Sequence, residues 1–493
     1  MAATMGSDML TIVLAAGKGT RMKSEIPKPL HKVGGRTLLA HALASTAELG
    51  ARKSAVVVGP EMEQVAHEAR THDATCEIFV QANQRGTADA VLAARTAIAD
   101  NGASAVLVLF CDTPLLRPQT LGRLSAALAE GAHVAVLGFE AADPTGYGRI
   151  LTSADGSVSA IREHKDASAE ELAVRLCNGG VMAFRCPDLL GLLDRIGSAN
   201  AKGEFYLTDA IELARGDGLR VVAVTCAEEE VMGINDRVQL SEAEAVFQNR
   251  AREAAMRAGA TLTAPETVWF SYDTQLGRDI VVEPNVFFGP GVVVEDGVTI
   301  HANCHFEKAH IGANAEIGPF ARLRPGAALS EKVKIGNFVE VKNVTMGKGA
   351  KANHLAYLGD GSVGEGANIG AGTIFCNYDG YRKNKTTIGA GAFVGSNSSL
   401  VAPVTIGDGA YVGSGSVITK DVPADALSVE RSEQKTIPAW AARRRSQLKK
   451  ARGRVNAPST ARRGIQFASR SRHEPRVTSC VTNFELSPRS AST

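Results

Sequence analysis

The sequence predicts an α/β domain with a mainly parallel sheet, followed by a parallel β-helix. In residues 10–240, apolar strand-like runs alternate with amphipathic stretches, which is typical of an α/β domain. From residue 286 onward, apolar residues recur every six positions, a period that fits neither a helix nor a flat sheet. Because 493 residues are too many for one ordinary core, two or three domains are expected.

The first half contains five apolar runs that we expect to be strands, in addition to the run at residues 10–14 that opens it. They are Ala55–Val58, Cys76–Val80, Ala105–Phe110, Val134–Leu137 and Arg220–Val224. Helical patterns at residues 88–99 and 120–129 fall between them. Because ligands of such domains gather at the carboxyl ends of parallel strands, the residues that follow these runs are the first candidates for a site.

The segment after the opening run is rich in glycine and alanine. Residues 14–22 are LAAGKGTRM, and PKPL follows at 27–30. Small residues let the backbone approach a ligand, with its N–H groups turned toward anionic oxygens. Arg21 and Lys28 add the positive charge that a triphosphate requires. The segment resembles the signature loop of sugar-1-phosphate nucleotidyltransferases, although a purely structural glycine turn is the alternative.

Two polar residues are candidates for holding a divalent cation. Asp112 follows the run at residues 105–110, and Asn235 precedes a helical stretch. Mg²⁺ takes oxygen ligands, often only one or two of them from the protein, and it neutralises phosphate charge. We therefore expect Asp112 and Asn235 to bind Mg²⁺, although each could instead be a turn former or a helix cap.

Residues 236–260 are expected to form one linking helix that ends near Gly259. The second half is a repeat of six residues. Its apolar positions are Val286, Val292, Val298, Cys304, Ile311, Ile317, Leu323, Leu329, Ile335, Val341, Ile388, Val394, Leu400, Ile406, Val412 and Ile418. Glycine often follows directly. Such a period fits short strands that turn at small residues and place one apolar side chain inside per step, which is a parallel β-helix. It resembles the left-handed hexapeptide helix.

Two features of the second half suggest chemistry. Residues 377–385 are polar and aromatic where the next repeat should begin, so this segment should loop out, and its Lys and Arg residues suit an anionic substrate. His354 lies where the repeat slips register and could act as a general base at neutral pH. The alternatives are a solvated loop and an ordinary turn histidine.

The basic residues are concentrated at one end of the chain. Residues 441–493 hold 13 Lys/Arg and 2 Asp/Glu, whereas the first 440 residues hold 41 basic and 50 acidic residues. With little to bury, this basic tail, residues 441–493, is expected to be disordered, and a C-terminal arm precedes it from residue 431. A polybasic tail could bind nucleic acid or anionic lipid, but it lacks regular aromatic residues, so a solvated extension is favoured.

The 8 cysteines, at positions 76, 111, 177, 186, 226, 304, 376 and 480, form no Cys-x-x-Cys pair. This spacing argues for a reducing compartment and against a zinc site or a disulfide framework. The sequence shows no signal-peptide pattern and no uninterrupted apolar stretch of about 18 residues. We therefore expect a cytoplasmic protein that does not associate with membranes.

Longer motifs carry a closer resemblance. They are LAAGKGTRM (14–22), PKPLH (27–31), DPTGYGRI (143–150), EHKDA (163–167), GEFYLTD (203–209), NFVEVK (337–342), HLAYLGD (354–360), NIGAGT (368–373) and CNYDG (376–380). Over about residues 10–431 the chain resembles the bacterial bifunctional N-acetylglucosamine-1-phosphate uridyltransferase/glucosamine-1-phosphate acetyltransferases. The resemblance implies a Rossmann-like nucleotidyltransferase domain at 1–235, a linker helix at 236–260, a left-handed β-helix acetyltransferase domain at 261–430, and an arm and tail at 431–493.

The resemblance also implies a two-step function. Acetyl-CoA and glucosamine 1-phosphate would give N-acetylglucosamine 1-phosphate, which UTP would convert to UDP-N-acetylglucosamine for peptidoglycan and lipid A synthesis. By the same resemblance His354 is the general base, acetyl transfer is direct, and the protein is a homotrimer.

Residue by residue, the resemblance implies four binding sets. The residues implied for the nucleotide and its sugar are Leu14, Ala15, Ala16, Gly17, Arg21, Lys28, Gln81, Gly86, Thr87, Gly148, Glu163, Asn178 and Asn235. The residues implied for Mg²⁺ are Asp112 and Asn235. The residues implied for glucosamine 1-phosphate are Arg324, Lys342, Tyr357, Asn368 and Lys383. The residues implied for acetyl-CoA are Ala371, Asn377, Tyr378, Ser396, Ser414 and Arg431.

The chain departs from the family pattern at three places. Cys111 replaces the glycine of the usual Tyr-Gly-Asp, Asp89 stands where histidine is common, and Gly179 stands where threonine is typical. Two alternatives remain: a nucleotidyltransferase of single activity whose β-helix serves only assembly, and a scaffold or nucleic-acid binder driven by the tail. His354, the loop that begins at residue 377 and the length of the match argue against the first of these, and removal of residues 441–493 would test the second.

Overall fold

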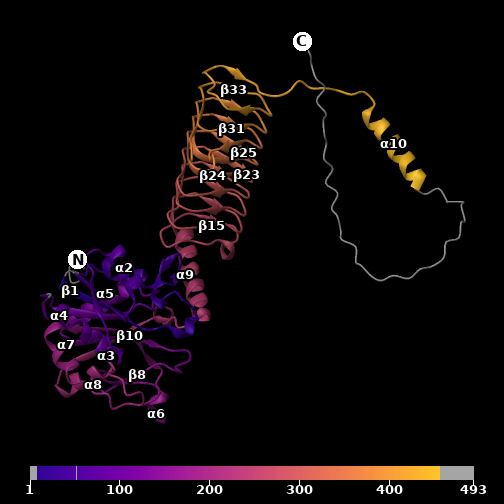
Figure 1. Ribbon diagram of the computed structural model, residues 1–493. Coiled ribbons are helices and arrows are strands. Elements are labelled where there is room, and N and C mark those ends of the chain that lie inside the picture. The colour runs from indigo at the N-terminus through magenta and orange to yellow at the C-terminus, as the bar shows by residue number, and fades with distance from the viewer. Residues whose placement is uncertain (1–7, 52, 101, 456–493) are drawn as a thin grey trace, which may run out of the picture. The chain divides into compact units, whose positions relative to one another are not determined.

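A computed structural model describes residues 8–51, 53–100 and 102–455 (Figure 1). The first part is a nine-stranded sheet whose main path runs β11-β7-β10-β6-β1-β4-β5. Its strands are β1 (Met9–Ala15), β4 (Lys53–Val58), β5 (Glu77–Val80), β6 (Ala105–Phe110), β7 (Val134–Glu140), β8 (Arg149–Thr152), β9 (Val158–Arg162), β10 (Leu176–Arg185) and β11 (Val221–Cys226). All the strands expected in this half are present.

The sheet differs from the expected one at β10. This strand runs antiparallel to both β6 and β7, and it carries the β8–β9 hairpin beside it. The remaining neighbours on the main path, β11 with β7, β6 with β1, β1 with β4, and β4 with β5, are parallel. The sheet is therefore mainly parallel, with one antiparallel strand in its middle.

Helices cover both faces of this sheet. They are α1 (Leu38–Glu48), α2 (Glu63–His72), α3 (Thr87–Ala93), α4 (Arg95–Asp100), α5 (Pro118–Ala129), α6 (Ala169–Leu172), α7 (Cys186–Leu193) and α8 (Asp209–Gly216). Strand β1 alternates, with Leu10 and Ile12 in the core formed with α3, α4, α7 and α8, and Met9 and Val13 in the core formed with α1, α2 and α5. The helical pattern at 88–99 is split at Ala94 into α3 and α4.

The linking helix is α9 (Arg237–Arg257). It begins where the Asp236 carboxylate accepts hydrogen bonds from the backbone N–H groups of Val238 and Gln239, as a helix cap does. Just beyond its end, Gly259 adopts a φ of +109°, which favours glycine. The buried Gln248 of α9 donates to the carbonyl of Phe270 at 2.7 Å, which fixes the helix to the first coil of the second half.

The second half is a parallel β-helix built of short strands. They are β12 (Thr261–Leu262), β13 (Gln275–Leu276), β14 (Val281–Val282), β15 (Phe287–Phe288), β16 (Val293–Val294), β17 (Thr299–Ile300), β18 (His305–Phe306), β19 (Ala309–Ile311), β20 (Glu316–Ile317), β21 (Arg322–Leu323), β22 (Ala327–Leu329), β23 (Lys334–Asn337), β24 (Glu340–Met346), β25 (Lys351–His354), β26 (Tyr357–Val363), β27 (Asn368–Ile369), β28 (Ile374–Cys376), β29 (Thr386–Ile388), β30 (Phe393–Val394), β31 (Ser399–Val401), β32 (Val404–Ile406), β33 (Tyr411–Val412), β34 (Val417–Ile418) and β35 (Leu427–Ser428).

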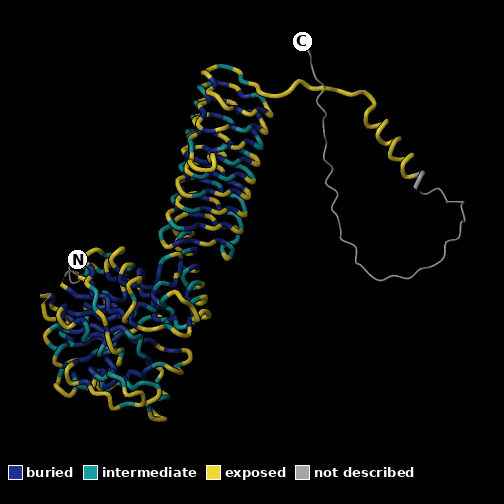
Figure 2. The backbone as a smooth tube through the Cα atoms, viewed as in Figure 1, coloured by how far each residue is buried: buried dark blue, intermediate teal, exposed yellow. Residues whose placement is uncertain are grey.

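The predicted repeat is confirmed by burial. Every apolar residue of the six-residue series is at most 3% exposed, and these residues belong to one continuous core. In Figure 2, buried segments recur along the whole coil. The hand of the coil stays a prediction.

Steric crowding between coils explains the glycine that often follows the apolar residue of the repeat. At Gly336, a Cβ atom would lie 1.9 Å from the carbonyl oxygen of Asn353 in the next coil. Stacked coils therefore approach too closely at this position for any side chain.

The expectation of a disordered tail is wrong for residues 441–455. They belong to helix α10 (Trp440–Val455), which lies in a separate unit that begins at Ser432. Its alanine, arginine, leucine and lysine residues have high intrinsic helix propensity, which outweighs the lack of a buried face. The rest of the predicted tail, 456–493, lies outside the described residues. Within the part that the structure describes, no helix is both long and apolar enough to cross a membrane.

Candidate active sites

A cavity of about 400 Å³ lies at the carboxyl ends of β1 and β6. It is where the sequence predicted a nucleotide site, because the chain leaves both strands there. Predicted residues that line it are Leu14, Ala15, Ala16, Gly17, Lys28, Gln81, Gly86, Thr87 and Asp112. Arg21 is exposed on the short turn of helix η2 (Thr20–Met22) and is not among the lining residues.

Lys28 joins the two predicted metal ligands. Its Nζ lies 2.5 Å from Asp112 Oδ2 and 3.0 Å from Asn235 Oδ1. The backbone N–H of Ile234 also donates to the carbonyl of Asp112 at 3.0 Å, which ties the two segments together. Both side-chain oxygens therefore face one point that favours a cation, and the donor set of a carboxylate and an amide oxygen fits Mg²⁺.

Gly19 allows Lys28 to reach this point. The glycine has a φ of +59°, and a Cβ atom there would lie 2.5 Å from the Lys28 Cβ. A side chain at position 19 would push Lys28 away from the carboxyl ends of the strands, so the glycine of the motif serves close approach.

Three residues predicted for the sugar come together beside the cavity. The N–H of Asn178 donates to the carbonyl of Gly148 at 2.8 Å, and a Cβ on Gly148 would lie 3.5 Å from Glu163 Oε1. Burial raises the pKa of Glu163, and the Thr208 hydroxyl donates to its carboxylate at 3.3 Å. This group offers a carboxylate, an amide and a glycine without a side chain, which suits a sugar bearing hydroxyl groups.

The residues predicted for the base lie at the start of α3. A Cβ on Gly86 would lie 2.4 Å from the carbonyl oxygen of Phe205, and the Thr87 hydroxyl accepts from the N–H of Leu207 at 2.8 Å. The GEFYLTD motif is thus packed directly against this loop. Sequence reasoning missed the role of Asp89 here: its carboxylate accepts from Gln81 Nε2 at 2.9 Å and pairs with Arg85 at 2.8 Å.

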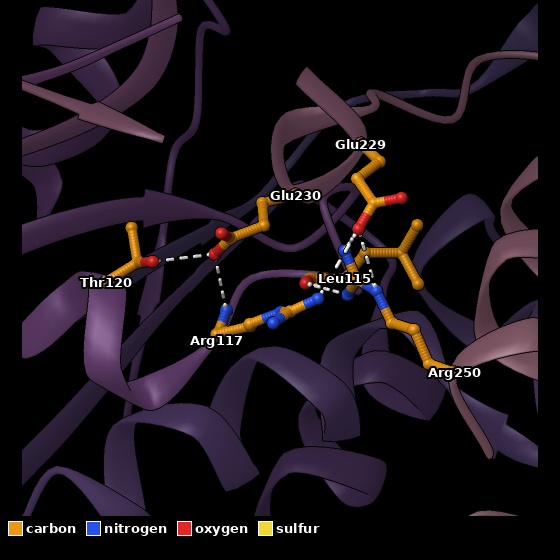
Figure 3. Close-up of polar contacts among 6 residues, drawn as sticks. All are labelled: Leu115, Arg117, Thr120, Glu229, Glu230 and Arg250. Carbon is orange, nitrogen blue, oxygen red and sulfur yellow. Dashed lines mark hydrogen bonds and ion pairs between the residues drawn. The ribbon is translucent and has the colours of Figure 1, made fainter. Parts of the chain in front are cut away.

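A polar network behind the cavity was also missed. Arg250 of α9 donates to the Glu229 carboxylate at 2.7 Å and to the carbonyl of Leu115 at 2.8 Å (Figure 3). The buried Glu230 accepts from the Thr120 hydroxyl at 2.7 Å and from the N–H of Arg117. The network ties together the segments that follow Asp112 and precede Asn235. No local pattern could predict it, because Arg250 and Leu115 are 135 positions apart.

One corner of the β-helix carries the predicted base and three residues of the acetyl-CoA set. Backbone N–H groups of successive coils donate to the carbonyls of Asn337, His354, Ala371 and Ser396, so these residues hold equivalent corner positions. Ser414 follows in the next coil, and its carbonyl accepts from Arg431 at 2.8 Å. We call this line, Asn337–His354–Ala371–Ser396–Ser414, the histidine corner.

His354 is exposed, and its Nδ1 lies 2.7 Å from Asn337 Oδ1. An amide oxygen only accepts, so Nδ1 carries the proton and Nε2 is left as an acceptor. A surface hollow of about 330 Å³ lies beside the ring, lined by Phe320 and Phe338 among others.

A second corner gathers most of the glucosamine 1-phosphate set. Lys342 Nζ lies 3.8 Å from Asp360, and the same carboxylate accepts from the side chains of Asn343 and Asn377 at 2.8 and 2.5 Å. Lys342 lowers the pKa of the neighbouring Lys383, which means that two ammonium groups lie close together. We call this group the lysine corner.

Two more predicted residues lie at the lysine corner. Arg324 is one coil before Lys342 in equivalent strands and pairs with Glu340 at 2.8 Å. The Tyr357 hydroxyl crosses Gly359, where a Cβ atom would lie 2.5 Å from it. Several cations with few carboxylates around them suit a phosphate.

The structure does not unite every predicted residue. Asn368 lies in β27, paired with Lys351 rather than with the lysine corner. Tyr378 is exposed in the extruded loop, where its hydroxyl donates to the carbonyl of Gly380 at 2.6 Å. Among the described residues, no hydrogen bond or ion pair joins His354 to Arg324 or Lys342. One copy of the chain therefore presents two separate corners.

Comparison with known proteins agrees with this division. Residues 11–174 match the family model of the MobA-like NTP transferase domain, and residues 385–420 match that of the bacterial transferase hexapeptide (six repeats). A protein of Azorhizobium caulinodans is 60% identical over 446 residues, covering 90% of this chain and 98% of its own length. Relatives from Xanthobacter autotrophicus and Zymomonas mobilis are 59% and 49% identical over 445 residues, covering 90% and 89% of this chain and 99% and 98% of their own lengths. All three are named bifunctional protein GlmU.

Proposed function

The chain belongs to the bifunctional GlmU family, and from this premise we propose how its two sites divide the two reactions. It is a uridylyltransferase and an acetyltransferase in one polypeptide. The observation that carries the assignment is the coexistence of the Lys28–Asp112–Asn235 group in the first half with the histidine corner in the second. The predicted domain limits, 1–235, 236–260, 261–430 and 431–493, stay proposals.

In the first half, a phosphate oxygen of N-acetylglucosamine 1-phosphate attacks the α-phosphorus of UTP, and the bond to pyrophosphate breaks. The backbone of Leu14–Gly17 lines the phosphate side, with Lys28 and Arg21 supplying positive charge. Mg²⁺, held by Asp112 and Asn235, would neutralise charge on the phosphates. Gly148, Glu163 and Asn178 would hold the sugar, so the reaction depends mainly on positioning and charge.

In the second half, the amine of glucosamine 1-phosphate attacks the thioester carbonyl of acetyl-CoA, and the coenzyme A thiolate leaves. The neutral Nε2 of His354 accepts the amine proton, because Asn337 holds the other ring nitrogen as a donor. Arg324, Lys342 and Lys383 would bind the phosphate, assisted by Tyr357 and Asn368. Ala371, Ser396, Ser414 and Arg431 would line the coenzyme, with Asn377 and Tyr378 near the acetyl group.

A closed homotrimer would bring the two corners together. Phe338 and Leu355, beside the histidine corner, have φ angles of +57° and +50° and side chains 53% and 60% exposed. A bulky residue in this conformation costs about 1–3 kcal/mol, and exposed apolar side chains gain by contact with a partner. A neighbouring copy that places its lysine corner against this ridge would complete the site, and three-fold symmetry closes the ring. Sedimentation that gives a fully active monomer would contradict this arrangement.

We also propose a cytoplasmic location. Cysteines 76, 111, 177, 186, 226, 304 and 376 are all free thiols in the described part of the chain, which suits a reducing compartment. UDP-N-acetylglucosamine made there would supply synthesis of the cell envelope.

Two assays test the proposal on the intact chain. Glucosamine 1-phosphate with acetyl-CoA should release a free thiol, and N-acetylglucosamine 1-phosphate with UTP and Mg²⁺ should release pyrophosphate. Pyrophosphate without thiol release would favour the alternative of a single-activity nucleotidyltransferase with a structural β-helix. Deleting residues 441–493 should leave both activities unchanged, since every proposed site residue lies at or before Arg431.

A further inference from the structure

The side-chain amide of Gln81 has both of its N–H groups engaged. Gln81 is 5% exposed, and its Nε2 lies 2.9 Å from the carbonyl oxygen of Gly86 and 2.9 Å from Asp89 Oδ2. Gln81 also lines the cavity at the carboxyl ends of β1 and β6. One end of this amide is therefore held by protein, and the other end is left for a ligand.

These contacts allow only one orientation of the amide. A carbonyl and an ionised carboxylate both accept and cannot donate. Rotating the amide by half a turn would set Gln81 Oε1 against two acceptors, which is repulsive and leaves polar groups unpaired. Gln81 Oε1 is thus fixed as the free end and offers a hydrogen-bond acceptor to the cavity.

The Asp89 carboxylate is itself held in the ionised form. Its side chain is only 15% exposed and pairs with the Arg85 guanidinium, whose Nε and NH2 atoms approach Oδ1 at 3.2 and 2.8 Å. Burial alone would raise the pKa of Asp89, but hydrogen bonds from Gln81 and Arg85 outweigh it and hold this pKa below its ordinary value. Arg85 in turn lies over the Phe205 ring at 5.3 Å, so the carboxylate has a fixed partner.

We propose that Asp89 is a specificity-determining positioning residue, which orients the Gln81 amide so that the site accepts uracil and rejects cytosine. The proposal deepens the use of UTP proposed above and rests on it. The 3-position of uracil carries an N–H that can donate to Gln81 Oε1, whereas the same position of cytosine is an acceptor. Cytosine would set two acceptors against each other, and a site built to receive a donor discriminates strongly against a group that lacks it.

The test compares pyrophosphate release from UTP and from CTP in the full-length chain. Asp89→Leu keeps a branched side chain of similar size but removes one of the two acceptors of Gln81 Nε2, which weakens the preference of the amide for this orientation. We expect the UTP:CTP ratio of kcat/KM to fall by about tenfold or more, which is the size of one misplaced hydrogen bond in a binding site. Asp89→Asn retains one oxygen that can accept from Gln81 and should give an intermediate ratio.

Two controls separate specificity from folding. Asp217→Leu removes another Arg–Asp pair of the same half, that with Arg195, and neither residue lines the cavity. Its ratio should equal that of the unmodified chain. Thiol release from acetyl-CoA should be unchanged in every variant, because it depends on the second half.

The outcomes distinguish a failure of the proposed function from a failure of the proposed role of Asp89. If the unmodified chain does not use UTP, the proposed function fails. If it uses UTP and Asp89→Leu keeps the UTP:CTP ratio within twofold while thiol release persists, the role of Asp89 is overturned. If Asp89→Leu also loses thiol release, the Asp89→Asn variant decides. A UTP:CTP ratio of folded Asp89→Asn that matches that of the unmodified chain also overturns the role of Asp89.

Discussion

The two halves of the molecule build their sites in opposite ways. In the α/β half, residues far apart in sequence, such as Lys28, Asp112 and Asn235, converge on one point inside a cavity. In the β-helix, residues at repeat spacing line up along an exposed corner, and two such corners stay apart within one copy. The α/β half gathers its candidate residues within one copy, whereas the β-helix offers two surfaces that a neighbouring copy would complete in the proposed trimer.

The largest expected effect tests whether the first site is independent of the second. Asp112→Ala removes the carboxylate that pairs with Lys28 and faces the proposed metal position. We expect pyrophosphate release to fall by about a thousandfold or more, since metal and charge stabilise the transition state. Thiol release, measured on the same sample, should be unchanged. Loss of both pyrophosphate release and thiol release in a folded protein would contradict the independence of the two sites.

The reciprocal change comes next. His354→Ala removes the proposed acceptor of the amine proton, and general-base catalysis contributes about 10²- to 10⁴-fold. Thiol release should fall by that range and pyrophosphate release should not change. Asn337→Asp is a matched variant: it keeps an oxygen beside Nδ1 and should cost far less than His354→Ala. Equal losses would mean that Asn337 has more than an orienting role.

A smaller effect should follow at the network behind the cavity. Arg250→Met keeps the length of the side chain but frees the carbonyl of Leu115 and leaves the Glu229 carboxylate only its longer contact with Arg117 at 3.4 Å (Figure 3). We expect about a tenfold loss of pyrophosphate release with a higher Mg²⁺ concentration for half-maximal rate, because small displacements at a site are costly. Arg257→Met, which removes an exposed pair on the same helix, is the control. An unchanged Mg²⁺ dependence would remove Arg250 from this role.

The smallest effect concerns the pH dependence of stability, which should have opposite signs in the two halves. Burial and then the charge of Glu212 raise the pKa of Asp209 to about 6, so its stabilising contribution exists below pH 4 and is lost as pH rises through about 6. Burial alone would raise the pKa of Asp360, but hydrogen bonds from Asn343 and Asn377 and the charge of Lys342 hold it low. Its contribution therefore exists above its unfolded pKa and is lost as pH falls.

Urea unfolding at pH 4 to 7 measures this difference. Asp209→Asn should flatten the decline between pH 4 and pH 6 and raise the free energy of unfolding at pH 7 by about 1 kcal/mol, a value reduced for the solvent that reaches this half-buried group. Asp360→Asn should instead lower stability at pH 7. A gain in both variants would contradict the opposite signs.

The contrast between the two halves also explains which parts of the structure could be predicted from the sequence. The six-residue period located a line of interior positions from Val286 to Val341 and from Ile388 to Ile418, because each of these repeats carries its own apolar residue. Core residues between these two runs, such as Leu358 and Phe375, were not located. Most strands of the α/β half were found from continuous apolar runs, but β8, β9 and the antiparallel β10 were not. In β10, residues 178–180 interrupt the apolar run at a bulge. The cavity-lining residues Leu14–Gly17 and Asp112 could be singled out because they lie at the carboxyl ends of β1 and β6, and their roles stay predictions. Arg250, Glu229 and the role of Asp89 were missed because they act through partners that only folding brings near.

The Arg250 network determines where a fragment of the first half should end. The linking helix supplies Arg250, which braces the segments that follow Asp112 and precede Asn235, so the helix is tied to the first half as well as connecting the two halves. A shortened version that stops at residue 235 would lack this brace and would also end on a proposed metal ligand. Fragments made to isolate nucleotide transfer should extend through Ala258, where the helix is capped.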